Sequence, residues 1–266
     1  MSKKVSILML TYNGEKYLKE AIDSCLNQTY ENIEVCIIDD GSTDKTVEIL
    51  KSYGDKIKVS YNETNQGITA NVNKLALNVE SDYIVWIGHD DKLAPNHVEL
   101  LLSEFTEDTV LVFCNAVIIN ENGNQVGIMK DDGEMFQKLK NPMFELSLNN
   151  FLNAIGQMIR VDAFKKVSGW NTDYKNYGDW FFYIKILQIG NIKYTTKIKS
   201  YYRVHQTNIS NTLRTKKVRV SVEDWAKNAR KFAHSLHDNT IMENINYYYN
   251  YIKIDVKIFI KKVLGI

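Results

Sequence analysis

Two pairs of adjacent aspartates are the residues of this chain best suited to chemistry. Asp39-Asp40 and Asp90-Asp91 each directly follow an apolar run with the composition of a strand. Acids at the carboxyl ends of strands in an α/β sheet lie where ligands usually bind. Four carboxylates in one crevice repel each other unless the crevice also holds a divalent cation, or donors such as ribose hydroxyls and a base N–H. For either pair alone, a strand-to-helix turn with capping aspartates is the alternative.

A fifth acid, Asp179, comes immediately before the aromatic run Trp180-Phe181-Phe182. This position predicts the first turn of a helix, where the helix dipole favours an anion. An aspartate there serves either as an N-cap or as a general base, and the spacing alone does not decide between the two roles.

The first 120 residues alternate strand patterns with helix patterns. Strands are expected at Val5–Leu10, Ile33–Ile38, Ile57–Tyr61, Tyr83–Gly88 and Val110–Ile119. Strands that alternate with helices predict a mostly parallel sheet with right-handed crossovers. The carboxyl edge of that sheet would bring both aspartate pairs together with the polar loop that follows the first strand.

The remainder of the chain has a different pattern. Residues 127–150 show no clear periodicity and are expected to form a long, loop-rich excursion, whereas residues 216–266 look mostly helical. Ile252, Val256, Phe259 and Val263 make a helical stripe, although the run 252–260 also alternates like a strand. We favour a basic amphipathic helix, which can lie on an anionic membrane surface, on the body of the protein or on another subunit.

Composition indicates a soluble globular protein. The chain has 266 residues, 44% hydrophobic and 24% charged, and its net charge of +1 gives no reason to expect nucleic acid as a partner. Charge is concentrated at the end, because residues 214–266 carry 11 Lys/Arg and 5 Asp/Glu, a balance of +6. The three cysteines lie in apolar runs without CxxC spacing and are expected to be reduced core residues.

The sequence has neither a signal peptide pattern nor an apolar run of about 18 residues. We therefore expect a cytoplasmic protein, or one that is peripheral to the inner face of the cell membrane. The chain also lacks GxGxxG and GxxxxGK[ST], which disfavours a dinucleotide oxidoreductase and a P-loop NTPase.

Four segments, in their order and spacing, resemble glycosyltransferase family 2. They are Val5–Gly14 with Glu15, the run Ile38–Asp44 (IDDGSTD), Asn65-Gln66-Gly67, and Gly88-His89-Asp90-Asp91. The resemblance implies an α/β fold of the GT-A nucleotide-sugar transferase type and an inverting, metal-dependent sugar transfer. It also implies a donor-binding half at 1–120 and an acceptor and base half at 121–212 of the same domain, and the charge and pattern of the remaining residues predict a basic, mostly helical extension at 213–266.

By this resemblance, the residues that bind the nucleotide-sugar are Thr11, Tyr12, Asn13, Glu15, Asp39, Asn65, Gly67 and Asp90. Asp39 would accept a hydrogen bond from the N3–H of uracil or thymine, which cytosine lacks. Asp91 would be the main ligand of Mg²⁺ or Mn²⁺, since hard cations prefer oxygen ligands, and His205 a further candidate ligand. His89 departs from the family pattern, which often has another aspartate there.

The resemblance assigns the general base to Asp179, although Gly178 stands where the family usually has Glu. Trp170 and Trp180 are expected to stack on acceptor sugars or, alternatively, to pack in the core, and Arg203 is a candidate phosphate ligand. The expected reaction moves a sugar from a UDP- or dTDP-sugar to a glycan or lipid-linked glycan in surface polysaccharide synthesis. A nucleotidyltransferase and a non-catalytic sugar-nucleotide-binding protein are the alternatives.

Overall fold

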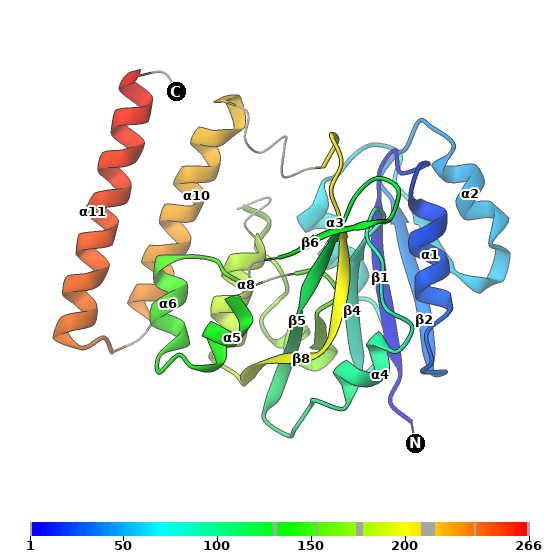
Figure 1. Ribbon diagram of the computed structural model, residues 1–266, viewed down its shortest axis with the longest axis horizontal. Helices are drawn as coiled ribbons and strands as arrows, with labels where there is room; N and C mark the ends of the chain where they lie inside the picture. The colour runs from blue at the N-terminus through cyan, green and yellow to red at the C-terminus, as the bar shows by residue number, and fades with distance from the viewer. Residues whose placement is uncertain are drawn as a thin grey trace.

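A mixed β-sheet carries both aspartate pairs. The computed structural model describes residues 2–129, 132–152, 154–173, 178–208, 216–236 and 238–264 (Figure 1). The sheet has eight strands in the order β3-β2-β1-β4-β7-β5-β6, and β8 also pairs with β5. Their bounds are β1 (Val5–Thr11), β2 (Ile33–Asp39), β3 (Lys58–Tyr61), β4 (Tyr83–Gly88), β5 (Thr109–Ile119), β6 (Gln125–Ile128), β7 (Met158–Arg160) and β8 (Asn191–Arg203).

Most of the strands run in one direction, as the sequence predicts. β1 is parallel to β2 and β4, and β2 is parallel to β3. The short β7 is antiparallel to both β4 and β5, so β5 and its parallel partner β8 share the direction of β4. β6 is antiparallel to β5. The carboxyl ends of the parallel strands therefore meet at one edge, as a ligand site of an α/β sheet requires.

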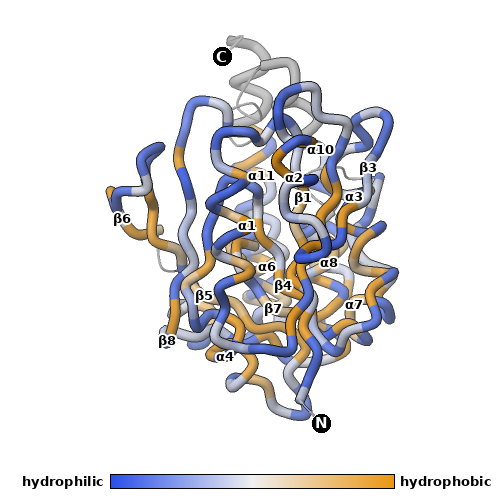
Figure 2. The backbone as a smooth tube through the Cα atoms, turned by 90° about the vertical axis from the view of Figure 1, so that its right-hand side faces the viewer, coloured by the Kyte–Doolittle hydropathy of each residue, from blue (hydrophilic) through white to orange (hydrophobic). Residues whose placement is uncertain are grey.

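Helices cover both faces of the sheet. One face packs on α1 (Leu18–Leu26), α2 (Thr46–Ser52) and α4 (His97–Leu102), and a 3-10 turn at Gly54–Lys56 follows α2. The other face packs on α3 (Ile68–Ala76), α7 (Val161–Lys166) and α8 (Gly178–Ile186). Ile7 belongs to the first core cluster and Leu8 to the second, because successive side chains of a strand point to opposite faces. Figure 2 shows the resulting apolar strands between more polar connections.

The excursion at 127–150 is more regular than expected. It contains α5 (Asp132–Gln137) and α6 (Pro142–Leu148). The Asn141 side chain caps α6 by accepting a hydrogen bond of 3.0 Å from the Phe144 N–H, and Pro142 occupies the first turn. The prediction of a loop was wrong here because helices of this length show too few repeats of the helical period.

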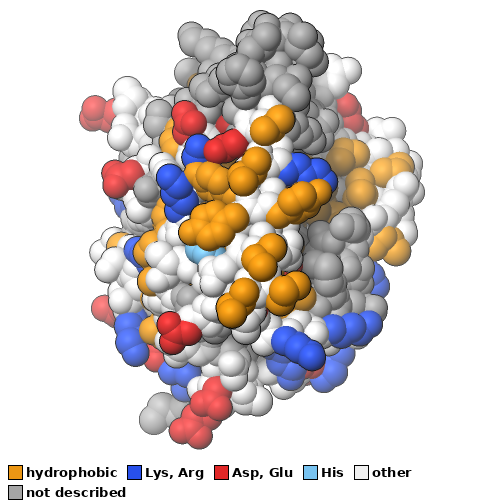
Figure 3. Space-filling model, turned by 90° about the vertical axis from the view of Figure 1, so that its left-hand side faces the viewer, with side chains coloured by type: hydrophobic (Ala, Val, Ile, Leu, Met, Phe, Trp, Pro, Cys, Tyr) orange, Lys and Arg blue, Asp and Glu red, His pale blue; other side chains and the backbone are white. Residues whose placement is uncertain are grey.

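The end of the chain is helical, and the strand alternative is excluded. α10 (Lys216–Ser235) packs on α6 and α8, and α11 (Ile241–Leu264) packs on α6. The His234 ring stacks on Tyr247 at 3.6 Å between centroids, which joins the two helices. Apolar side chains of α11 nevertheless remain on the surface, where Figure 3 shows a row of them.

The three cysteines, Cys25, Cys36 and Cys114, are buried and free, as predicted. Within the described residues, no helix is both long and apolar enough to cross a membrane.

Candidate active site

The ends of β1, β2 and β3 form a pocket around Asp39. Sheet register pairs Asp39 with Thr11 on one side and with Tyr61 on the other. A cavity of about 400 Å³ is lined by Asp39, Gly41, Ser42, Thr43, Val47, Lys51, Tyr61, Asn62 and Glu63. Tyr61 was not predicted as a site residue, but it ends a predicted strand at the level of Asp39. Its ring is 46% exposed and offers a face for a planar ligand.

Asp39 has one carboxylate oxygen without a protein donor. The side chain is 2% exposed, and its Oδ2 accepts a hydrogen bond of 3.2 Å from the Ser42 N–H. Its Oδ1 is buried and has no hydrogen-bond partner among the described residues. A buried, unsatisfied acceptor costs about 1–3 kcal/mol, and that cost disappears when a ligand N–H reaches it.

The loop after β1 is tied to the loop after β2. The Asn13 side chain accepts a hydrogen bond of 2.8 Å from the Thr43 N–H, and Glu15 accepts one of 3.0 Å from the Lys45 N–H. Both residues thus brace the pocket wall through their side chains. Tyr12 is 45% exposed, whereas Thr11 is buried at the strand end. Two of these four predicted residues thus contact the loop that forms part of the pocket wall, whereas none of the four lines the cavity itself.

Asp40 organises the turn that contains Asn65 and Gly67. Its Oδ1 accepts hydrogen bonds of 2.8 Å from the Gln66 N–H and from the Asn62 amide, and its Oδ2 accepts one of 3.0 Å from the Gly67 N–H. Burial alone would raise the pKa of Asp40, but these hydrogen bonds outweigh it and lower the pKa. Asp40 is consequently committed to the protein, and Asn65 is exposed at the edge of the turn.

The second pair, Asp90-Asp91, places two carboxylate oxygens over Gly88. A methyl group added to Gly88 would lie 2.7 Å from Asp90 Oδ1 and 3.1 Å from Asp91 Oδ2. Burial and the adjacent charge of Asp90 raise the pKa of Asp91 well above its usual range. Two acids that oppose each other's ionisation at one point are stabilised as anions by a cation between them.

Three residues at and beyond the end of β8 hold this pair. The Arg203 N–H donates to Asp91 Oδ1 at 3.0 Å, and His205 Nε2 lies 2.9 Å from Asp90 Oδ2. The Asn208 amide also donates to Asp90 Oδ2, at 3.2 Å. Asn208 was not predicted as a site residue, although it lies only three residues after His205.

Arg203 and His205 make contacts in the structure that differ from those the sequence predicts. Arg203 is 1% exposed, and its guanidinium binds the Glu20 carboxylate and the carbonyls of Asp90, Asn120 and Glu121. It is thus a buried brace, and the expectation that it binds phosphate was wrong. His205 engages Asp90 through one ring nitrogen and Thr207 Oγ1 through the other. Direct ligation of a metal would first require one of these contacts to break.

The Asp90-Asp91 pair fits a hard divalent cation. Asp91 Oδ2 and Asp90 Oδ1 have no hydrogen-bond partner among the residues described, while the opposite oxygen of each carboxylate is fixed by a protein donor. No group of three or more His, Cys, Asp or Glu side chains within the described ranges makes a complete metal site. Mg²⁺ sites often use one or two carboxylates and take further oxygens from substrate phosphates.

Asp179 lies in the first turn of α8, as predicted. Its side chain is only partly exposed, and burial raises its pKa to about 6 against the hydrogen bonds from the Trp180 N–H and Asn150. A carboxyl group with a pKa near working pH is well matched to general acid–base catalysis. Tyr177, a further candidate for stacking on a sugar, lies outside the described residues.

The start of α8 is packed against the start of α3. A methyl group at Gly178 would lie 2.9 Å from Thr69 Cγ2, in the first turn of α3. α3 begins directly after Gly67, whose N–H is bound by Asp40. A continuous set of contacts thus links the start of α8, which contains Asp179, to Asp40 beside the pocket.

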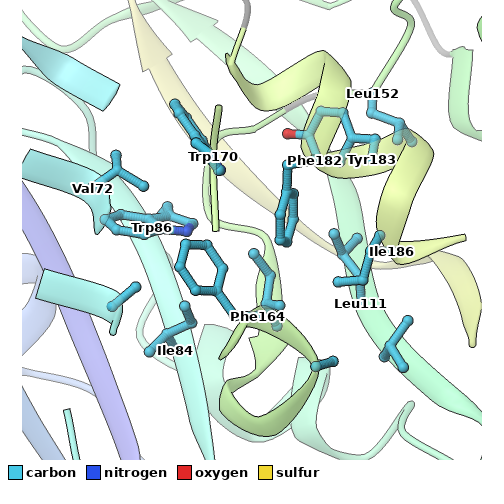
Figure 4. Packing of buried hydrophobic residues seen from close by; sticks show 14 of the residues in the cluster. Val72, Ile84, Trp86, Leu111, Leu152, Phe164, Trp170, Phe182, Tyr183 and Ile186 are labelled. Carbon is cyan, nitrogen blue, oxygen red and sulfur yellow. The ribbon is translucent and has the colours of Figure 1, made fainter. Parts of the chain in front are cut away.

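The two tryptophans expected at the acceptor site are mostly buried. Trp180 is 1% exposed, and its Nε1 donates to the Leu146 carbonyl at 3.0 Å. Trp170 is 9% exposed and packs on Trp86 with ring centroids 6.2 Å apart (Figure 4). In this structure both rings belong to the core, which was the alternative interpretation of the sequence.

Comparison with known proteins identifies the family. The family model of glycosyl transferase family 2 matches residues 6–168, which is more than half of the chain. The chain belongs to this family. An uncharacterized glycosyltransferase of Rickettsia typhi, RT0329, is 34% identical over 215 residues, which are 79% of this chain and 67% of that protein. The chondroitin synthase of Pasteurella multocida is 30% identical over 255 residues, 92% of this chain but 26% of the synthase.

Solved structures show the same fold. S. aureus TarS 1–349 in complex with UDP aligns with a TM-score of 0.62 at 21% identity, over 94% of this chain and 80% of that one. A mannosyltransferase from Pyrobaculum calidifontis, PcManGT, in complex with GDP-Man and Mn²⁺, aligns with a TM-score of 0.61 at 13% identity, over 97% and 87%. The chain is therefore a glycosyltransferase with the GT-A fold that the sequence predicts.

Proposed function

We propose that this enzyme transfers a sugar from a UDP- or dTDP-sugar to a hydroxyl of a glycan, with inversion and with a divalent cation. The observation that carries the proposal is the Asp39 carboxylate, which lines the cavity with one buried oxygen free of any described donor. An N3–H of uracil or thymine supplies the missing donor. The relation to TarS, solved with UDP, supports the same donor class.

In the proposed reaction, Asp179 accepts the proton of the acceptor hydroxyl while that oxygen attacks the anomeric carbon. The nucleoside diphosphate leaves from the opposite face of the sugar, so the configuration inverts. Asp90 and Asp91 would hold Mg²⁺ or Mn²⁺, which neutralises charge on the departing diphosphate when it is bound. Arg203, His205 and Asn208 keep the two carboxylates in place.

A glycan acceptor is supported by the relation to chondroitin synthase, and its lipid-linked form by the C-terminal helices. The exposed fractions along α11 are 58% at Ile245, 61% at Ile252 and 50% at Val256, with Tyr248 and Tyr249 between them. Together with the +6 balance of residues 214–266, this surface suits an anionic membrane. We place the enzyme at the inner face of the cell membrane, in surface polysaccharide synthesis.

Two other functions are less well supported. The loop from Leu10 to Lys16 is not the glycine-rich basic loop that a nucleotidyltransferase uses to hold a triphosphate. A protein that only binds sugar nucleotides needs no partly buried acid at the acceptor side, whereas the pKa of Asp179 is raised to about 6.

A ligand panel tests the proposal directly. We expect UDP or dTDP, but not CDP or GDP, to raise the melting temperature, and the increase to be larger with Mn²⁺. Under the same conditions, NMR of the product made from an α-linked UDP-sugar should show a β-glycoside. A retained α-configuration would falsify the inverting mechanism, and the absence of any shift with UDP or dTDP would remove the donor assignment.

A further inference from the structure

The two oxygens of Asp179 are held by different parts of the chain. Oδ1 accepts a hydrogen bond of 2.7 Å from the Trp180 N–H of its own helix, and Oδ2 accepts one of 3.3 Å from the Asn150 amide. Among the described residues, which exclude 174–177, Asn150 is the side chain that donates to Asp179. Because Oδ1 is committed to the helix backbone, Oδ2 is the oxygen available to accept a proton, and Asn150 sets its direction.

The orientation of the Asn150 amide is fixed by its other end. Asn150 Oδ1 accepts a hydrogen bond of 3.4 Å from the Leu152 N–H, so its NH₂ group points to Asp179. Asn150 is the second residue after α6, and the intervening Asn149 has the extended angles φ −157° and ψ 151°. The end of α6 therefore decides where this amide lies.

The C-terminal helix α10 holds the end of α6. Arg230 Nε donates to the Leu148 carbonyl at 2.9 Å, and its guanidinium lies 5.3 Å from the ring centroid of Trp180. Leu148 has one of the last carbonyls of α6, which lack partners within the helix and attract a cation. Trp180 in turn donates to the Leu146 carbonyl at 3.0 Å. One arginine thus contacts the segment that carries Asn150 and the residue that follows Asp179.

We propose that Asn150 is a positioning residue for Asp179 and that Arg230 fixes Asn150 in place. Through Arg230, α10 contributes to the geometry of the catalytic base. The inference rests on the proposed role of Asp179 as the base. It gives the C-terminal helices a role in the reaction that does not depend on membrane contact.

This arrangement predicts how the pH dependence of the reaction changes when the Asn150 amide is removed. Burial raises the pKa of Asp179, and Asn150 opposes that shift by donating to the carboxylate. The titratable neighbour is Tyr183 on α8, whose pKa burial and the charge of Asp179 raise, while the Arg230 cation on α10 lies over the Trp180 ring. Loss of the Asn150 amide therefore moves the acid limb of kcat/KM to higher pH.

Asn150→Ala tests the positioning role, and Asn149→Ala is the matched control. Asn149 is exposed and its side chain makes no hydrogen bond to the described residues. The assay follows UDP release with the UDP-sugar and methyl glycoside that react fastest in a panel. We expect Asn150→Ala to lower kcat about ten-fold, to leave the donor KM within about two-fold, and to raise the acid-limb pKa. Asn149→Ala should match the wild type.

Arg230→Met tests the contribution of α10, and Lys231→Met removes the same charge from an exposed neighbour. We expect Arg230→Met to reproduce the kcat loss and the pH shift, and the double variant with Asn150→Ala to lose little more than either single one. Arg230→Lys, which keeps the cation, serves if the Met variant does not fold. UDP-induced stabilisation checks that the donor pocket is intact.

The outcomes separate this inference from the proposed function. If Asp179→Asn is inactive while Asn150→Ala behaves like Asn149→Ala, the positioning role is overturned and the base remains. If Asp179→Asn keeps wild-type activity, the base assignment itself fails. If the losses of kcat in Asn150→Ala and Arg230→Met are fully additive in the double variant, Arg230 does not act through Asn150.

Discussion

The two aspartate pairs use their carboxylates in different ways. Both carboxylate oxygens of Asp40 accept hydrogen bonds from the turn at 62–67, whereas one oxygen of Asp39 has no donor among the described residues. In the second pair, each carboxylate has one oxygen fixed by a protein donor and one directed over Gly88. In the first pair, Asp40 thus stabilises a turn while Asp39 is available to a ligand, because the two side chains have different hydrogen-bond partners.

Asp39→Asn should weaken UDP binding about 10- to 100-fold, since a hydrogen bond to a charged acceptor is worth about 1.5–3 kcal/mol. Isothermal titration calorimetry measures the Kd. Asp55→Asn, an exposed site in the 3-10 turn, is the control and should leave the Kd unchanged. CDP has no N3–H, so its weaker binding should not fall further in the variant. An equal loss for UDP and CDP would contradict the base contact.

Asp179→Asn should stabilise the protein at neutral pH. The folded-state pKa of about 6 lies above the usual 3.8, so the folded protein binds more protons than the unfolded chain between these values. Stability is therefore lost as pH rises through that window, and a neutral Asn avoids the loss. We expect a gain of roughly 1–2 kcal/mol at pH 7.5 that shrinks toward pH 4, measured by urea unfolding. An equal gain at both pH values would assign the effect to packing.

At the level of single residues, the sequence predicts which side chains can take part in chemistry better than it predicts where those side chains lie. The acids could be found because carboxylates at strand ends and helix starts follow from local patterns. Trp170 and Trp180 could not be assigned to core or surface, because their burial depends on α6 and Trp86, which are distant in sequence. Arg203 looked like an anion ligand because its partner Glu20 lies 183 residues away along the chain.

Among the elements, the end of β8 has a particular function. It returns from the second half of the chain to the edge where β4 ends, and its last residue, Arg203, binds the Asp91 carboxylate and the Asp90 carbonyl. The long pairing of β5 with β8 sets this position. The second half of the chain therefore completes the geometry of a site whose acids come from the first 120 residues.

Arg203→Met should destabilise the fold by about 2–4 kcal/mol, because it leaves the carbonyls of Asp90, Asn120 and Glu121 without the guanidinium that donates to them. Urea denaturation measures the change. Arg160→Met is the control, since Arg160 pairs with Asp162 at the surface and its loss should cost less than about 1 kcal/mol. Similar losses in both variants would show that Arg203 is no buried brace.

The parallel direction of the main strands could be predicted because the alternation of strand and helix patterns is local. The insertion of β7 between β4 and β5 could not, since a three-residue strand leaves no periodic signal. The same limit explains α5 and α6. The loop after α6 contains Asn150, and the last carbonyl of α6 accepts the hydrogen bond from Arg230, so a part of the fold that the sequence predicts poorly is also the part that positions Asp179.

In the molecule as a whole, the aspartate pairs and the apolar face of α11 lie on different parts of the structure. The carboxyl edge of the sheet holds the acids, and α11 presents an apolar surface on the outer side of α10 and α6 (Figures 1 and 3). The exposed apolar residues of that helix are Ile241, Met242, Ile245, Tyr248, Tyr249, Ile252 and Val256. Most of them recur at helical spacing, so one face of α11 is apolar while the opposite face packs on the protein.

The double variant Ile245→Asn/Ile252→Asn should lose binding to anionic vesicles without loss of stability or of UDP binding. Burial of each side chain in the lipid interface contributes about 1.5–3 kcal/mol, so losing two should reduce partitioning at least about 100-fold. Sedimentation with phosphatidylglycerol vesicles measures binding, and the wild type should bind less at high salt and to phosphatidylcholine.

Val126→Asn/Ile128→Asn is the matched control, because these residues of β6 are 58% and 53% exposed on a different element. It should bind vesicles like the wild type. If the wild type shows no vesicle binding and light scattering finds a dimer that only the α11 variant disrupts, the apolar face serves a second copy of the chain. In that case the proposed location at the membrane is wrong, while the donor pocket and the base retain their own tests.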